Sequence, residues 1–156
     1  MRYLILLFTS GLLLTSCGPD VVYDQAQATD AGGWTYADSL TFEFIITDTT
    51  RRYDMVLSLD HATDFPTQNL YVELATEFPD GRRTVQPVSL ELANNYGEWF
   101  GDCGVERCDF SVAIQPAARF DEVGAHRLVV KQYSRDERLV GIAEVGLQLL
   151  VAELGN

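Results

Sequence analysis

From Trp34 onward, apolar and polar positions alternate along the chain with a repeat of two residues. In the segment 40–48, Leu40, Phe42, Phe44 and Ile46 alternate with mostly polar neighbours. The segments 53–60, 69–77, 85–92, 110–114, 127–133 and 139–151 follow the same pattern in whole or in part. Successive side chains of a β-strand point to opposite faces, so each segment predicts a strand with one face on a core and one in water.

Turn residues separate these predicted strands. Pro79-Asp80-Gly81 stands between 69–77 and 85–92, where proline presets φ and glycine accepts a positive φ. We find no convincing helical period. About seven or eight strands joined by turns predict an all-β fold, an antiparallel β-sandwich of jelly-roll or immunoglobulin-like type, with a small closed β-barrel as the alternative.

Proline and glycine mark special positions within two of the strands. Pro87 lies inside 85–92, and because proline cannot donate to a strand ladder, it predicts an edge strand or a bulge. Gly141 and Gly146 lie in the last segment, where they predict a bulge or a close approach of another part of the chain.

The first residues have the features of an export leader. Met1-Arg2 is a short positive start, and the run from Tyr3 to Leu14 is almost wholly apolar. That run is too short for a bilayer span, which needs about 20 residues, and suits a signal peptide. Leu14-Thr15-Ser16-Cys17 then resembles the lipobox of bacterial lipoproteins, whose cysteine receives a diacylglyceryl group before the leader is cut off. We expect a signal peptide at 1–16 and a mature chain that starts at lipidated Cys17; a plain signal peptide is the alternative.

The mature chain is long enough for one hydrophobic core and too short for two. Residues 18–33 are polar and lack periodic apolar positions. We therefore expect a lipidated N-terminus and tether over 17–33, followed by a single β-sandwich domain over 34–156.

Cys103 and Cys108 remain as a pair once Cys17 carries lipid. An exported chain meets an oxidising compartment, where a close pair of cysteines more often forms a disulfide than a thiol site. Metal binding is the weaker alternative, because two cysteines without a nearby histidine are not four ligands. The enclosed loop is short, so the expected entropic stabilisation is only about 2 kcal/mol.

The net charge of −12 and the presence of a single lysine, Lys131, limit the kinds of partner. An acidic surface without a basic stripe repels phosphate backbones and anionic lipid headgroups. This argues against a nucleic-acid partner and leaves the N-terminal lipid as the means of membrane attachment.

Sequence motifs for catalysis or metal binding are missing. There is no nucleophile elbow, HExxH helix, Gly-rich phosphate loop or D-x-D-x-D calcium loop. His61 and His126 lie far apart in the sequence, and we expect both to be structural or exposed. A small hydrolase whose site assembles across loops is a minor alternative, because catalytic triads form in space. We predict no enzymatic activity, no metal and no cofactor.

Aromatic residues offer a better candidate for a binding surface, because Tyr and Trp combine a large contact area with a polar group. The candidate surface consists of Trp34, Tyr71, Tyr96, Trp99 and Phe100. The loop that begins at Asn94 and is closed by the expected disulfide is the segment best suited to recognition. Two alternatives stay open: Trp34 and Trp99 close the ends of the core, or Trp34, Tyr96 and Trp99 stack against a carbohydrate.

Several segments also occur together in a distinctive order. They are the leader with its lipobox, 38–48, 53–60 before 69–72, Pro79-Asp80-Gly81 ahead of 88–92, the Gly-Glu-Trp-Phe-Gly stretch 97–101, and 131–147 with a Gln, a polar turn and Leu-x-Gly-Ile-x-x-Val-Gly-Leu. Over nearly the whole chain this resembles the GldH family of gliding-motility lipoproteins of Bacteroidota-type bacteria. The stretch 125–130 and the Cys103/Cys108 pair depart from the pattern expected of that family.

This resemblance implies a non-enzymatic lipoprotein that is needed for gliding and is associated with the motility and type IX secretion apparatus of the cell envelope. Its partners would be other proteins of that apparatus. Gly18 follows Cys17 where an Asp retains lipoproteins in the inner membrane of some bacteria, and no acidic cluster follows. We therefore expect an outer-membrane lipoprotein that faces the periplasm.

Overall fold

The computed structural model describes residues 18 and 20–153. These residues form eight longer strands, β1 (Val21–Ala28), β3 (Ser39–Ile46), β4 (Tyr53–Ala62), β5 (Asn69–Glu77), β6 (Arg83–Glu91), β8 (Arg107–Ala118), β9 (Gly124–Gln132) and β11 (Ile142–Val151). Three strands of two residues accompany them: β2 (Trp34–Thr35), β7 (Asp102–Cys103) and β10 (Arg138–Leu139). Within this part of the chain, no helix is long and apolar enough to cross a membrane.

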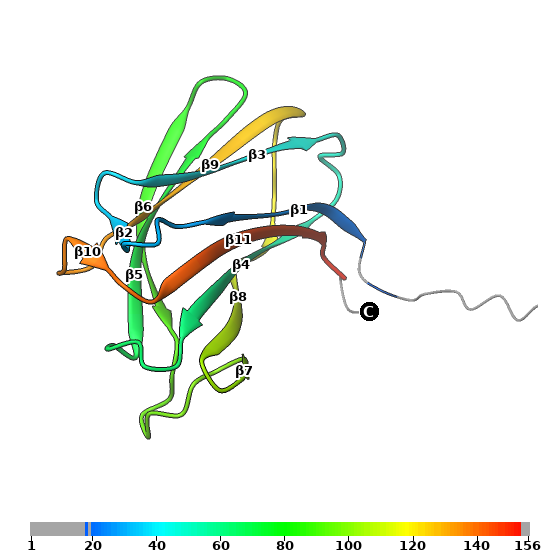
Figure 1. Cartoon of the computed structure of the whole chain (residues 1–156). Helices are drawn as coiled ribbons and strands as arrows, with labels where there is room; N and C mark the ends of the chain where they lie inside the picture. The colour runs from blue at the N-terminus through cyan, green and yellow to red at the C-terminus, as the bar shows by residue number, and fades with distance from the viewer. Residues whose placement is uncertain (1–17, 19, 154–156) are drawn as a thin grey trace, which may run out of the picture.

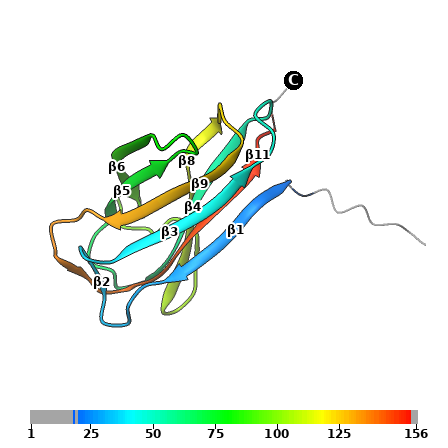
Figure 2. The same cartoon turned by 90° about the horizontal axis from the view of Figure 1, so that it is seen from above.

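The strands form two antiparallel sheets that pack face to face as a sandwich (Figures 1 and 2). One sheet has the order β1-β11-β4-β8-β7 and the other β3-β9-β5-β6, while β2 and β10 pair separately. The predicted antiparallel sandwich is therefore confirmed. Both sheets have terminal strands, so the closed-barrel alternative is wrong.

The core lies between the sheets and comes from the alternation seen in the sequence. In β4 every second residue from Tyr53 to His61 is buried, and the residues between them are half-buried. The opposing sheet contributes Phe42 and Phe44 of β3 and Val130 of β9. Burial of each large apolar side chain stabilises the fold by about 1.5–3 kcal/mol relative to exposure.

The first strand was missed, because residues 17–33 were predicted to be a tether. Val21–Ala28 instead pairs with β11 along its whole length. As a terminal strand with mostly exposed residues, it buries few apolar side chains and shows no alternation in the sequence. Only Tyr23 and Gln27 are half-buried along it, so the ordered domain already begins four residues after Cys17.

Two predictions about single residues are confirmed. Pro87 lies on β6, which is the last strand of its sheet. At Gly146, a Cβ atom would lie 2.3 Å from Oγ of Ser58 on the adjacent strand β4, so a side chain here would require the Ser58 hydroxyl to move. The register between β11 and β4 also shifts between Ile142 and Glu144, next to Gly141.

The sandwich has two distinct ends (Figure 1). At the end where β1 begins, the Val151 amide donates to the Asp20 carbonyl and the Ala152 amide to that of Arg52; we call this the N-terminal end. At the opposite end, the Thr63 amide donates to the Glu106 carbonyl. We call this second end the loop end, and it carries the disulfide.

Candidate interaction site at the disulfide loop

We call the segment 94–108, which includes β7 and is closed by the disulfide, the disulfide loop; a tight turn over Asn94–Glu98 shapes its first part. The side-chain oxygen of Asn94 accepts the amides of Tyr96 and Glu98, at 2.9 and 3.0 Å. The Asn94 Nδ2 group donates to Oε2 of Glu98 at 2.7 Å. These bonds present the Tyr96 side chain at the tip of the turn, where 91% of it is exposed.

The Gly-Glu-Trp-Phe-Gly stretch then turns its tryptophan toward the core. Nε1 of Trp99 donates to the Thr63 carbonyl at 3.0 Å, and Ala93 and Trp99 form an isolated β-bridge. Gly101 adopts φ +91°, and a Cβ atom at this position would lie 2.2 Å from the Asp109 carbonyl oxygen. Only glycine fits this close approach, which explains the second glycine of the motif.

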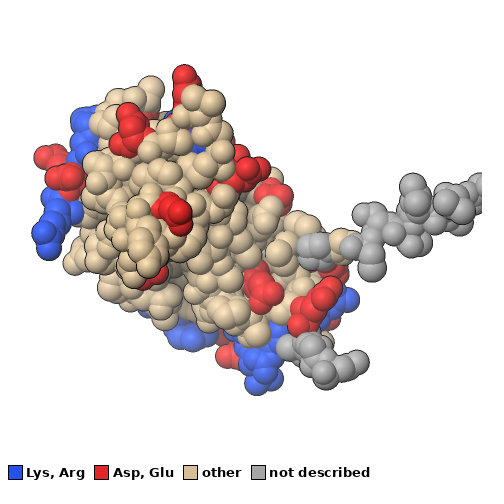
Figure 3. Space-filling model, turned by 90° about the horizontal axis from the view of Figure 1, so that it is seen from below, with Lys and Arg blue, Asp and Glu red and all other residues tan. Residues whose placement is uncertain are grey.

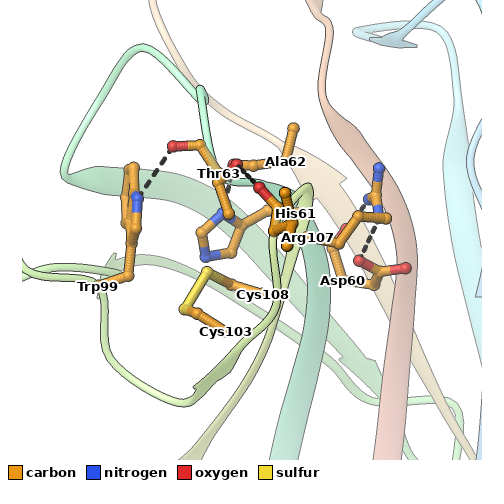
Figure 4. Close-up of a disulfide and its surroundings, with 9 residues drawn as sticks. Asp60, His61, Ala62, Thr63, Trp99, Cys103, Arg107 and Cys108 are labelled. Atoms are coloured by element: carbon orange, nitrogen blue, oxygen red, sulfur yellow. Dashed lines mark hydrogen bonds and ion pairs between the residues drawn. A yellow bond between two sulfur atoms is a disulfide. The ribbon is translucent and has the colours of Figure 1, made fainter.

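The disulfide joins Cys103 of β7 to Cys108 of β8, as predicted from the sequence. These residues are directly opposite each other in the antiparallel pair. Nearby, the Arg107 guanidinium forms an ion pair with the Asp60 carboxylate and also donates to the Asp60 carbonyl at 2.8 Å (Figure 4). The disulfide fastens β7 to β8, and the ion pair fastens the start of β8 to β4.

His61 lies beneath the loop and is fully buried (Figure 4). Its Nδ1 atom is 2.9 Å from the Ala62 carbonyl oxygen, so Nδ1 carries the proton and donates. Its ring lies edge-on to that of Trp99, with centroids 4.8 Å apart. Cys108 is its cross-strand neighbour. His61 is thus a core residue that supports the loop.

The second histidine, His126, is buried near the N-terminal end among Phe44, Phe78 and Phe120. Its Nδ1 atom is 3.1 Å from the Gly124 carbonyl oxygen. Among the described residues, neither histidine hydrogen-bonds to a Ser, Cys or carboxylate side chain. These two histidines therefore form no hydrolase site of the kind considered from the sequence.

Three residues of the loop expose apolar surface to solvent: Tyr96, Phe100 at 41% and Val105 at 95%. Figure 3 views the molecule from the side on which the loop and β7 lie in Figure 1. Uncharged residues form most of this face, several Asp and Glu side chains lie on it, and Lys and Arg side chains lie at its margin. The loop therefore presents exposed apolar side chains among the exposed carboxylates of Glu98, Asp102 and Glu106, a mixture that a protein partner could contact.

Trp34 does not belong to this surface, contrary to its place in the candidate set. It is 0% exposed and its Nε1 donates to the Asp38 carbonyl at 3.2 Å. The Asp38 side chain accepts the Thr35 hydroxyl at 2.7 Å and the Thr35 amide at 3.0 Å, which lowers the pKa of Asp38. Trp34 is a buried core residue held by these hydrogen bonds, so its ring is not accessible for stacking against a carbohydrate.

Tyr71, the remaining member of the set, lies on a different surface near the loop end. The Tyr133 amide donates to the Tyr71 carbonyl at 2.8 Å, and the Tyr36 hydroxyl donates to the Ser134 carbonyl at 2.8 Å. A hollow of about 490 Å³ lies here, lined by Tyr36, Glu73, Lys131, Gln132, Tyr133 and Ser134. The sequence alone did not reveal this group, because it depends on the pairing of β5 with β9. No group of three or more His, Cys, Asp or Glu among the described residues is placed to hold a metal ion.

Comparison with known proteins gives three kinds of match: a family model, individual relatives and solved structures. A protein-family model described as GldH lipoprotein matches residues 21–149. The "Gliding motility lipoprotein GldH" of Flavobacterium johnsoniae is 24% identical over 151 residues, which are 92% of this chain and 93% of that protein. The "Gliding motility lipoprotein GldH homolog" of Christiangramia forsetii is 24% identical over 152 residues, which are 93% of this chain and 92% of that protein.

Among solved structures, the infectious bursal disease virus VP2 subviral particle aligns with TM-score 0.37 and 12% identity over 85% of this chain and 31% of that chain.

Proposed function

The chain belongs to the GldH lipoprotein family, and on that premise we propose that it is a lipid-anchored envelope protein that supports gliding motility and type IX secretion through contacts with other envelope proteins. The observation that carries the proposal is similarity to a gliding motility lipoprotein along nearly the full length of both chains. Its role is that of a binding or assembly component rather than an enzyme.

Lipidation at Cys17 is part of this proposal. The lipobox-like Leu14-Thr15-Ser16-Cys17 supports it. The first strand, β1, begins four residues after this cysteine, at Val21. Four residues span at most about 14 Å. The N-terminal end of the sandwich would therefore lie close to the bilayer, and the disulfide loop would point away from it toward partners.

The outer membrane, with the domain facing the periplasm, is the location that the residues after Cys17 favour. Gly18 stands where Asp marks inner-membrane retention in some bacteria, and no acidic cluster follows. The exposed loop residues Tyr96, Phe100 and Val105 are then available to periplasmic partners.

The test is a Cys17→Ser variant expressed in the native host in place of the wild-type chain. Without the thiol no lipid can be attached, so the variant should leave the membrane fraction and fail to support colony spreading and delivery of surface adhesins. Tyr96→Ala with Phe100→Ala is the companion variant, which should stay in the membrane fraction and reduce spreading. Normal spreading of a strain that lacks the gene altogether contradicts the proposed function.

A carbohydrate is the second candidate ligand, now in the hollow lined by Tyr36 and Tyr133, which we call the tyrosine hollow, rather than on the tryptophans. Tyr36 and Tyr133 line this hollow with exposed aromatic rings beside the polar groups of Lys131 and Glu73, a combination that suits saccharides. A glycan array should show binding that Tyr133→Ala abolishes while the unfolding midpoint is unchanged. An array with no bound glycan contradicts this candidate.

A further inference from the structure

The edges of the two sheets are protected to different degrees. On one side of the sandwich, β1 and β3 lie against each other, and the Gln27 side chain acts as a substitute strand. Its Nε2 group donates to the Thr41 carbonyl, and its Oε1 atom accepts the Thr41 amide at 3.4 Å. This side chain occupies the backbone groups of Thr41 that an incoming strand would need, which blunts this edge.

On the other side, β6 is protected by Pro87. The Phe78 amide donates to the Arg82 carbonyl at 2.9 Å, so the backbone groups of Arg82 point toward β5. Backbone groups point alternately to the two sides of a strand, so those of every second residue after Arg82 also point toward β5. The backbone nitrogen of Pro87 therefore points away from β5, toward the outer edge. Proline has no amide hydrogen to offer there, which blunts the edge.

The remaining edge, that of β8, has such protection only beyond Ala113, where the register to β4 shifts and Pro116 follows. The Gly104 amide donates to the Arg107 carbonyl at 2.8 Å, so the same alternation directs the backbone of Asp109 toward β7 and that of Ser111 and Ala113 toward the same side. However, β7 pairs only with Cys108 and Asp109. Within the described residues, no strand continues the sheet beside Ser111 and Ala113, and both are exposed.

The core is also incompletely covered beside this edge. Val112 and Ile114 of β8 point inward but are only half-buried, whereas Leu57, the cross-strand partner of Val112, is fully buried. Val88 of β6, in the opposing sheet, is half-buried as well. A further strand beside β8 would cover these three side chains and satisfy the backbone groups of the edge.

We propose that the β8 edge, at Ser111 and Ala113, is a docking site for an extended segment of another envelope protein, which pairs with β8 and continues its sheet. No charged residue occurs from Phe110 to Gln115. The occupant is therefore an uncharged strand with an apolar side chain at every second position, which packs beside Val112 and Ile114.

A second copy of this chain fits the edge less well. The net charge of −12 makes two copies repel each other. Antiparallel pairing of β8 with its own copy would also direct the two N-terminal ends in opposite directions, because Ala118 of β8 pairs with Tyr53 at that end. Both chains cannot then be anchored in one membrane through a short N-terminal segment. This step rests on the proposed lipid anchor.

The test uses the full-length chain in its native envelope, with a photo-crosslinking residue in place of Ser111. We expect one defined crosslinked product with a second protein. Ala113→Pro removes an amide from the docking edge without touching the ladder to β4, and should reduce this product by about tenfold or more, the equivalent of roughly one lost hydrogen bond. Ser89→Pro is the matched control, since it removes an outward amide from β6, and should leave the product unchanged.

Ala113→Glu is a second variant in case proline perturbs the fold. Its exposed position tolerates the side chain, and the added charge should also reduce the product. A product with the mass of two copies of this chain overturns the proposal, as does an equal effect of Ala113→Pro and Ser89→Pro. This experiment measures crosslinking at Ser111 and not motility. Normal spreading of a strain without the gene would therefore contradict the proposed function, but it would not change the conclusion about docking at the β8 edge.

Discussion

The imidazole of His61 and the indole of Trp99 meet edge to face, with ring centroids 4.8 Å apart. The contact joins the end of β4 to the loop that follows β6, and the bond from Trp99 Nε1 to the Thr63 carbonyl reinforces it. Trp99 thus closes the loop end of the core, while Tyr96 on the same loop stays in solvent. One loop therefore combines a residue that packs in the core with an exposed residue that we propose for recognition.

Trp99→Ala should lower the free energy of unfolding by about 3 kcal/mol, because it removes a large, partly buried ring and leaves a cavity beside His61. Trp99→Phe keeps an aromatic ring and loses the hydrogen bond to Thr63, so it should cost about 1 kcal/mol. Denaturant titration followed by circular dichroism measures both values. Equal stability of Trp99→Ala and wild type would contradict a role of this side chain in the core.

The disulfide should stabilise the loop by an amount that is small for the whole domain. A double Cys103→Ser, Cys108→Ser variant should lose about 2 kcal/mol, as the chain-entropy relation gives for a short loop. The wild-type chain in a thiol reductant should show the same loss, whereas the double variant should not respond to reductant. A domain that fails to fold at all without the bond would show that the disulfide holds more than the loop.

The alternation of apolar and polar residues predicted most of the strands, but it did not predict the edge strand β1 or the surface hollow. β3 was predictable because Phe42, Phe44 and Ile46 all face one core, whereas β1 lies at the edge and buries little apolar surface. Trp34 was misplaced because an amphipathic ring suits a core end as well as a surface. The tyrosine hollow depends on the register that brings Tyr133 beside Tyr71, which no local pattern reveals.

Gln132, the glutamine before the polar turn in the segment 131–147, holds that turn in place. Its buried side chain donates to the carbonyls of Asp136 and Glu137, at 3.1 and 3.0 Å, and accepts the Ser134 amide at 3.0 Å. Gln132→Ala should therefore cost about 2 kcal/mol, because three hydrogen bonds are lost together.

Hydrogen exchange provides a local test of this role. The turn after β9 positions Arg138 and Leu139, which pair with Thr35 and Trp34, so the amides of this pair should exchange faster in Gln132→Ala. Gln86→Ala, at an exposed position on β6, is the control and should change stability by no more than about 0.5 kcal/mol. Unchanged exchange of the β2–β10 pair would mean that the turn holds its shape without Gln132.

The Thr35–Asp38 network predicts a loss of stability in acid. Hydrogen bonds from the Thr35 hydroxyl and amide lower the pKa of Asp38, and the bonds from Thr50 and Arg82 do the same for Asp48 and Asp80. A carboxyl with a lowered pKa in the folded state stabilises the fold above its unfolded pKa of about 3.9, and this contribution disappears as the pH falls through the folded pKa. The midpoint temperature of unfolding should therefore fall as the pH is lowered below about 4.

Asp38→Asn and Thr35→Val should each make that fall smaller, because the first removes the titrating group and the second removes the hydroxyl that lowers its pKa. Thermal melts between about pH 6 and about pH 3 measure how the midpoint temperature depends on pH. This range extends from roughly two units above to one unit below the unfolded pKa. Identical slopes for wild type and both variants would contradict the role of Asp38.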